Sequence, residues 1–251
     1  MEKDIKDYRG KELKSYVIAN FLAILYGTGF LYKIAELIGG NRDLSLIASS
    51  ATFAVLTAVI YIFVFLADAL VPSEVKDAIV WFRCGRPGER IFTEIRDDNK
   101  DKRFSTQDAL VFYADIYESI DIESNEEKKK VIQNKNWYYL YKLHEKKTQI
   151  FVSQRDSLLC RDINVITIML FLGFIVLYFL SNNPFSCYTL LFFFIEFVLT
   201  RFLAQTKGNR YAYNVIATDI AAKKADNNAK RIKVDEENIE YYVIVQRKNE
   251  S

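Results

Sequence analysis

The chain has 251 residues, of which 51% are hydrophobic, 15% aromatic and 26% charged, and its formal charge is +2. The aromatic content excludes an intrinsically disordered chain, and three cysteines are too few for a disulfide-stapled secreted domain. Apolar and charged residues occupy separate blocks of the sequence, a distribution that argues against an ordinary soluble globular domain.

Four apolar stretches are long enough to cross a hydrocarbon core of roughly 30 Å, which takes about 17 to 25 residues as a helix. They are residues 16–38, 44–71, 164–180 and 185–204. A short segment of turn-forming residues separates the members of each pair, so the sequence predicts two transmembrane helical hairpins. No cleavable signal peptide is predicted, because the first apolar stretch is too long and follows fifteen mostly charged or polar residues.

The basic residues predict the orientation of these spans. Of 34 lysines and arginines, five precede Tyr16, seventeen lie between Ser73 and Ile163, and nine follow Ala204. The positive-inside rule then places both termini and the central segment in the cytoplasm. The predicted domains are a cytoplasmic segment 1–15, a hairpin 16–71, a cytoplasmic domain 72–163, a second hairpin 164–204 and a cytoplasmic tail 205–251.

Glu196 is the first candidate functional residue. It lies eleven residues after Phe185, about 16 Å along a helix and therefore near the bilayer midplane. An unpaired acidic side chain there costs about 2.5 to 3.5 kcal/mol on insertion scales. Two interpretations remain open: Glu196 lines a pore or carries a proton, or it is neutral and hydrogen-bonds to a neighbouring helix.

Two further sets of polar residues fall in the first predicted hairpin. Lys33 and Glu36 lie on one helix face and are expected to form an ion pair, or to extend toward the outer headgroups. The span 44–71 is rich in small and hydroxyl side chains, which favour close helix packing or partly line a polar path. The candidate path-lining residues are Ser45, Ser49, Thr52 and Thr57.

Four arginines gather near the start of the central segment. Arg83, Arg86, Arg90 and Arg96 surround turn-forming glycines and a proline, an arrangement that can present guanidiniums and backbone N–H groups to a phosphate-bearing ligand. The alternatives are contact with anionic lipid headgroups or pairing with nearby aspartates. The central segment has equal numbers of basic and acidic residues, which argues against a general nucleic-acid binder.

The cytoplasmic parts are predicted to form a small α+β domain. Ser105 and Asp108 resemble a capping box that starts a helix, and a second helix is expected over 125–144. Residues 150–152 are expected to form a strand, and 231–234 with 240–246 a terminal β-hairpin. Residues 209–229 are expected to extend the last span as a helix. The predicted fold class is therefore a mainly α protein with four spans and an α+β cytoplasmic domain.

The sequence contains none of the common catalytic or cofactor signatures. Phosphate-loop, dinucleotide, hydrolase and zinc-protease motifs are all missing, and the single histidine, His144, has no Cys or carboxylate at metal-ligand spacing. We expect no enzymatic activity, no cofactor and no metal.

The whole-chain architecture, several predicted spans with a charged cytoplasmic domain and a midplane carboxylate, resembles membrane effectors of bacterial anti-phage defence. It is most similar to the channel-type effectors paired with nucleotidyltransferases, such as the Hailong membrane protein. The resemblance is architectural and includes no motif, so no residue role is carried over. It implies a homo-oligomer, with a tetramer as the expected state, gating by a nucleotide or oligonucleotide signal, and a cytoplasmic nucleotidyltransferase as partner.

The sequence therefore supports two functional hypotheses. The first is an oligomeric pore or ion channel that disrupts the inner membrane in response to a cytoplasmic signal. The second is a non-conducting membrane scaffold or sensor that recruits a cytoplasmic partner through its tyrosine-rich helix and its terminal β-hairpin. A small transporter has less support, since the spans lack paired Gly/Pro interruptions.

Overall fold

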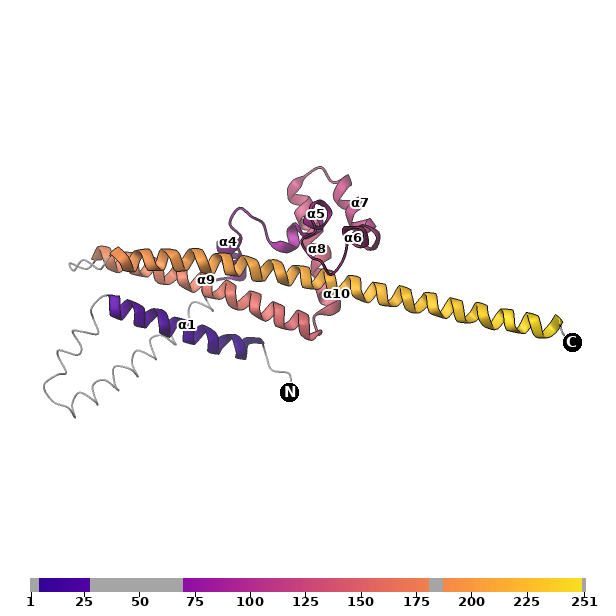
Figure 1. The fold of residues 1–251 in the computed structure, drawn as a ribbon. Helices are drawn as coiled ribbons and strands as arrows, with labels where there is room; N and C mark the ends of the chain where they lie inside the picture. The colour runs from indigo at the N-terminus through magenta and orange to yellow at the C-terminus, as the bar shows by residue number, and fades with distance from the viewer. Residues whose placement is uncertain (1–4, 28–69, 181–186, 250–251) are drawn as a thin grey trace, which may run out of the picture. The chain divides into compact units, whose positions relative to one another are not determined.

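The computed structural model describes residues 5–27, 70–180 and 187–249, and in these ranges every regular element is a helix (Figure 1). The helices are α1 (Ile5–Gly27), α4 (Ser73–Trp81), the 3-10 helix η1 (Pro87–Glu89), α5 (Ile91–Asp97), α6 (Thr106–Phe112), α7 (Ala114–Ile122), α8 (Glu126–His144), α9 (Thr148–Leu180) and α10 (Cys187–Asn249).

The predicted fold class is wrong in two respects. Within the described ranges, two helices and not four are long and apolar enough to cross a membrane, Thr148–Ile175 and Tyr188–Asn228. The apolar part of α1 is described only from Tyr16 to Gly27, which is too short for a span of about 17 residues. Nearly all of the predicted span 44–71 lies outside the described residues.

The predicted strands are also wrong, because the described residues contain no strand and so no α+β domain. Residues 150–152 belong to α9, where Ile150 is fully buried. Residues 231–246 continue α10. Their β-branched and aromatic residues favour a strand only weakly, and the stretch contains no Gly or Pro that would end the helix.

Three local predictions are confirmed. Ser105 caps α6, accepting a hydrogen bond from the backbone N–H of Asp108 at 3.1 Å while the Asp108 carboxylate accepts from the backbone N–H of Ser105 at 2.8 Å. The helix expected over 125–144 is α8, which begins at Glu126 with the side chain of Asn125 as its cap. Residues 209–229 continue the last apolar stretch as part of α10.

The chain divides into two compact units, and α9 and α10 contribute residues to both. The first unit comprises the described residues up to 85 together with 152–209, and the second comprises 86–151 together with 210–249.

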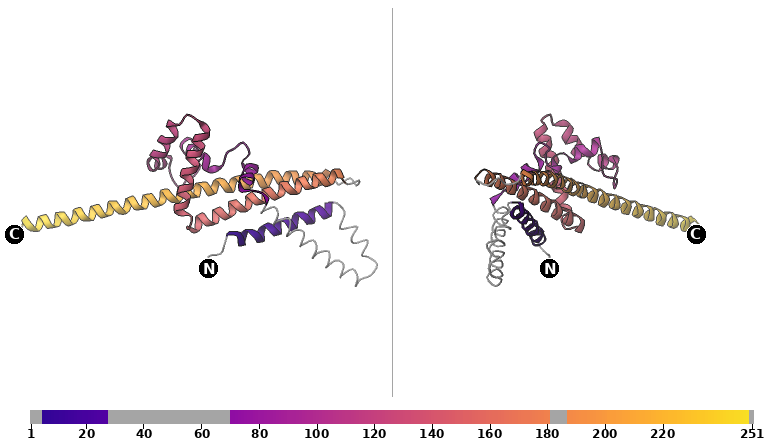
Figure 2. Two further views of the ribbon diagram at one scale, coloured as in Figure 1. Left: turned by 180° about the vertical axis from the view of Figure 1, so that it is seen from behind. Right: turned by 60° about the vertical axis from the view of Figure 1, so that its left-hand side comes forward.

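In the first unit, α9 and α10 run side by side in both sets of views (Figures 1 and 2). Helix α1 adds to their packing, with Leu13 and Val17 buried in one cluster with Leu170, Phe174 and Phe193. Just before the apolar part of α9, Arg161 lies 3.0 Å from Asp77 of α4, and Lys76 lies 3.6 Å from the buried Asp162.

The second unit packs α5 to α8 around α10. Its core comprises the buried residues Ile91, Phe92, Ile95, Phe104, Ala109, Tyr113, Tyr117, Ile120, Leu140, Ile150, Ala212, Val215, Ile216 and Ile220. The rings of Phe92 and Tyr113 meet edge to face with centroids 5.4 Å apart. The residues of α10 in this core are Ala212, Val215, Ile216 and Ile220, an i, i+3, i+4, i+8 spacing that is expected for one buried helix face.

A buried polar network and a basic pocket

Glu196 of α10 is held by two donors from α1. Its Oε1 accepts a hydrogen bond from the Tyr16 hydroxyl at 2.8 Å and from the Asn20 amide at 3.0 Å. Tyr16 and Asn20 lie four residues apart, so they share one face of α1 and reach the same carboxyl group. Of the two interpretations of Glu196, this geometry favours hydrogen bonding between helices.

Three hydroxyl and amide side chains extend this contact along α9 and α10. The Tyr16 hydroxyl lies 2.6 Å from Thr167 Oγ1, Thr167 lies 3.5 Å from Thr200 Oγ1, and Asn164 donates its amide to Thr200 Oγ1 at 3.0 Å. We call Tyr16, Asn20, Asn164, Thr167, Thr200 and Glu196 the polar network. Its members come from three helices of the first unit.

Several oxygens of the polar network are buried without a hydrogen-bond partner in the described part of the chain. They are Glu196 Oε2, Asn20 Oδ1 and Asn164 Oδ1. Asn20 is only 4% exposed and Asn164 is fully buried. A buried acceptor without a donor costs about 1 to 3 kcal/mol, so these oxygens make the network less stable than a fully satisfied one.

The other predicted intramembrane residues cannot be placed in this network. Lys33, Glu36, Ser45, Ser49, Thr52 and Thr57 all lie outside the described residues. Arg201, at the inner end of the last predicted span, donates to the carbonyl oxygens of Val80 at 3.3 Å and Phe82 at 3.2 Å. It therefore satisfies acceptors at the end of α4, where a cation also complements the helix dipole.

Each of the four arginines of the predicted cluster contacts a neighbouring side chain of its own unit. Arg90 is paired with Glu94 one turn later in the sequence, and Arg96 lies 2.7 Å from Asp121. The Arg96 guanidinium also lies over the ring of Tyr117, 5.8 Å from its centroid. The Asp121 carboxylate raises the pKa of Arg96. Arg90 and Arg96 therefore follow the predicted alternative, in which the arginines pair with carboxylates of the same protein.

The other two arginines are also engaged locally. Arg86 lies 3.9 Å from Glu89, its partner in the capping of η1, and Arg83 lies over the ring of Phe82, 5.2 Å from its centroid. Arg83 has a φ of 65°, in the left-handed region. Arg83 falls in the first unit and the other three arginines fall in the second.

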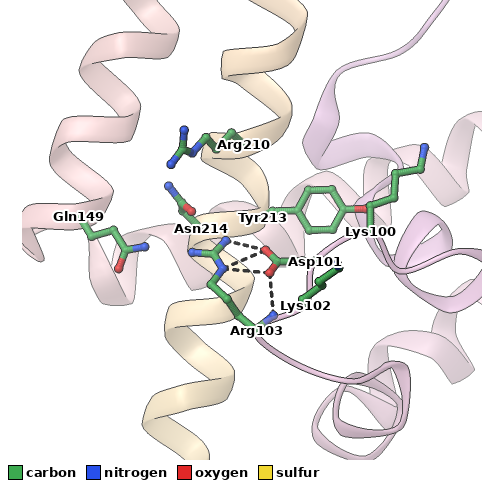
Figure 3. Close-up of a pocket in the computed structure, with 8 residues that line it drawn as sticks. All are labelled: Lys100, Asp101, Lys102, Arg103, Gln149, Arg210, Tyr213 and Asn214. Atoms are coloured by element: carbon green, nitrogen blue, oxygen red, sulfur yellow. Dashed lines mark hydrogen bonds and ion pairs between the residues drawn. The ribbon is translucent and has the colours of Figure 1, made fainter.

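A different set of basic residues lines a pocket of about 380 Å³ in the second unit (Figure 3). We call it the basic pocket. The loop between α5 and α6 contributes Lys100, Asp101, Lys102 and Arg103, the start of α9 contributes Gln149, and α10 contributes Arg210, Tyr213 and Asn214. No sequence motif indicates this site, because its residues come from three separate parts of the chain.

A second group was also missed, around the single histidine. His144 Nε2 lies 2.8 Å from Asp219 Oδ1, and the Tyr113 hydroxyl donates to Asp219 Oδ2 at 2.8 Å. Lys223 adds an ion pair at 3.0 Å. Burial opposes the charge of Asp219, but these three partners outweigh it and lower the Asp219 pKa. The search for a carboxylate near His144 in sequence missed Asp219, which is 75 positions away.

Within the described ranges, no group of three or more His, Cys, Asp or Glu side chains is arranged to hold a metal ion. Comparison with family models, with curated proteins and with solved structures found no match.

Proposed function

We propose that this chain is an integral membrane protein that acts as an oligomeric membrane effector, opening a pore in the bacterial inner membrane in response to a cytoplasmic signal, as in anti-phage defence. The observation that carries the membrane assignment is a band of outward-facing apolar side chains on α10. These are Tyr188, Leu191, Phe192, Phe194, Ile195, Val198, Leu199, Phe202 and Leu203, between 42% and 83% exposed.

A bilayer is the environment that fits this band. Burying one such side chain away from water is favourable by about 1.5 to 3 kcal/mol, and contiguous exposed apolar patches usually mark an interaction surface. The stretch 187–204 is about 27 Å long as a helix, close to the thickness of the hydrocarbon core. Lys207 and Arg210 then mark its exit from the membrane.

The polar network supports the same proposal from the inside of the first unit. Apolar side chains of α10 face outward, whereas Glu196, Thr200 and their partners meet between the helices. Membrane helices that associate in lipid use interhelical hydrogen bonds of this kind, and intramembrane carboxyl groups face the bundle interior. Rearrangement of this network is how we propose that a signal changes the packing of the spans.

Membrane insertion is tested with the double substitution Ile195→Arg and Leu199→Arg. Each arginine costs about 2.5 to 3.5 kcal/mol near the centre of a span, so we expect the variant to lose its resistance to alkaline carbonate extraction. Val131→Arg, at an exposed apolar position of α8, is the matched control and should remain in the membrane fraction. Full retention of the double variant would contradict the membrane assignment.

Pore formation is tested by following membrane potential with a voltage-sensitive dye in cells that express the protein. Depolarisation supports the effector.

The second candidate is a non-conducting membrane scaffold. It is favoured by exposed apolar side chains on α8, where Tyr138, Tyr139 and Leu143 are each more than half exposed and offer a docking face. This candidate predicts no depolarisation, together with loss of partner recruitment in Tyr139→Ser and Leu143→Ser.

A further inference from the structure

We propose that the basic pocket of the second unit binds a phosphate-bearing small molecule. This inference adds a ligand to the proposed function. Only the conclusion that this ligand is the cytoplasmic signal rests on the proposed function. The binding step itself depends only on residues of the second unit.

The charges of the basic pocket are the first argument. Lys100, Lys102 and Arg210 line it and form no ion pair with any described residue, whereas the arginines near the start of the same unit are paired with carboxylates. Asp101 is the one acidic residue that lines the pocket. The lining therefore carries an excess of positive charge, which attracts anions.

Asp101 also positions the fourth cation. Arg103 Nε donates to both carboxylate oxygens of Asp101, at 2.9 and 3.1 Å, and Arg103 Nη2 donates to Oδ2 at 2.5 Å. Arg103 Nη1 has no hydrogen-bond partner in the described part of the chain. A guanidinium fixed on one edge loses little entropy when its free edge binds an oxyanion.

The loop that carries these residues is itself ordered. The Asn99 amide donates to the carbonyl of Phe104 at 2.8 Å, and Asn99 Oδ1 accepts from the backbone N–H of Asp101 at 3.0 Å. The Phe104 side chain is buried in the core of the unit. The pocket is therefore largely preformed, as ligand sites usually are.

The independent argument for a ligand is Asn214. It is only 6% exposed, yet its amide forms no hydrogen bond within the described part of the chain. In Figure 3, Asn214 lies beside Arg210, with Gln149 and the Arg103 guanidinium facing the same space. The Asn214 amide atoms are not among the fully enclosed unpartnered atoms of the described residues, so they remain accessible from the pocket and can hydrogen-bond to a bound molecule.

The size of the pocket indicates the class of ligand. Its volume of about 380 Å³ lies within the range of small-molecule sites, roughly 300 to 1,000 Å³. Guanidiniums bind phosphoryl oxygens in a bidentate manner, and the Asn214 and Gln149 amides offer both donors and acceptors to a neighbouring polar group. The phosphate can belong to a soluble metabolite or to a lipid headgroup.

The test is calorimetric titration of the full-length protein in detergent micelles with sodium pyrophosphate as the probe. We expect saturable binding that weakens about tenfold or more in Arg210→Gln and in Asn214→Leu, because each loses a hydrogen bond to a charged group. Lys135→Gln is the matched control: Lys135 is an exposed α8 lysine outside the pocket, so affinity should change less than about twofold. Arg210 is exposed, so its replacement preserves the fold even if Asn214→Leu does not.

The source of the phosphate is distinguished in nanodiscs of phosphatidylcholine with or without phosphatidylglycerol. A weaker pyrophosphate affinity in phosphatidylglycerol discs assigns the pocket to a lipid headgroup, and an unchanged affinity assigns it to a soluble ligand. Absence of pyrophosphate binding to the unsubstituted protein in micelles and in phosphatidylcholine discs, or equal binding by Arg210→Gln, would overturn the proposal. Because micelle binding requires no conduction, its outcome is separate from that of the voltage-dye experiment.

Discussion

His144 Nε2 lies 2.8 Å from Asp219 Oδ1, and this contact joins the last turn of α8 to the part of α10 that enters the core of the second unit. The Asp219 side chain is only 5% exposed. Together with Tyr113 and Lys223, His144 supplies the donors that a buried carboxylate needs. The group therefore fixes the register of α10 against α6, α7 and α8.

Asp219→Asn should destabilise the second unit by about 3 kcal/mol, because it removes the charge that pairs with Lys223 and leaves buried donors poorly satisfied. The measurement is thermal unfolding followed by fluorescence of Trp137, in a background where the only other tryptophan, Trp81, is replaced by Phe. Glu118→Gln, an exposed change on α7, should stay within about 0.5 kcal/mol. Equal melting of the Asp219 and Glu118 variants would show that the group is not stabilising.

Asp108 provides a prediction about pH. Lys224 at 2.7 Å and the hydrogen bonds of Ser105 lower the Asp108 pKa to about 2. The folded pKa is below the ordinary value of about 3.9, so the stabilisation is complete above that value and is lost as pH falls toward 2. Asp108→Asn should therefore cost up to about 1 kcal/mol at pH 7, and the difference from the unsubstituted protein should vanish near pH 2. A difference that grows on acidification would contradict this sign.

Gly208 should not tolerate a side chain. A Cβ atom there would lie 2.5 Å from Trp81 Cζ2, so Gly208→Ala forces the indole to move. We expect a loss of about 1 to 3 kcal/mol, read from Trp81 fluorescence during thermal unfolding in a Trp137→Phe background. Gly10→Ala is the control, since no atom lies within 4 Å of its Cβ position, and it should be neutral or slightly stabilising. Matching melting curves for the two variants would contradict close packing of α4 on α10.

The contribution of Glu196 to stability should come from its acceptor oxygen more than from its negative charge. Glu196→Gln keeps an oxygen acceptor for Tyr16 and Asn20, whereas Glu196→Leu removes the acceptor that these two donors share and should cost about 1 to 3 kcal/mol. Thermal unfolding of the detergent-solubilised protein measures this difference. Equal stability of the two variants would show that the hydrogen bonds of Glu196 in the polar network do not contribute to the stability of the protein. In cells, unchanged depolarisation by the Glu196→Gln variant would show that the negative charge of Glu196 is not needed for ion permeation.

Local patterns made several features predictable. The Ser105 cap needs only residues three positions apart, and Asn125 and the apolar runs of α9 and α10 are equally local signals. Glu196 was identifiable because its neighbours are apolar. Its partners were not, because Tyr16 and Asn20 lie about 180 residues earlier in the chain.

The amino-acid sequence by itself determined the cap of α6 and the apolar runs of α9 and α10, because capping and hydropathy act over a few residues. Only the tertiary structure decided which charges are compensated. It paired Arg96 with Asp121, left Lys100, Lys102 and Arg210 around the basic pocket, and brought His144 to Asp219. Charge compensation depends on distance in space, which sequence separation does not reveal.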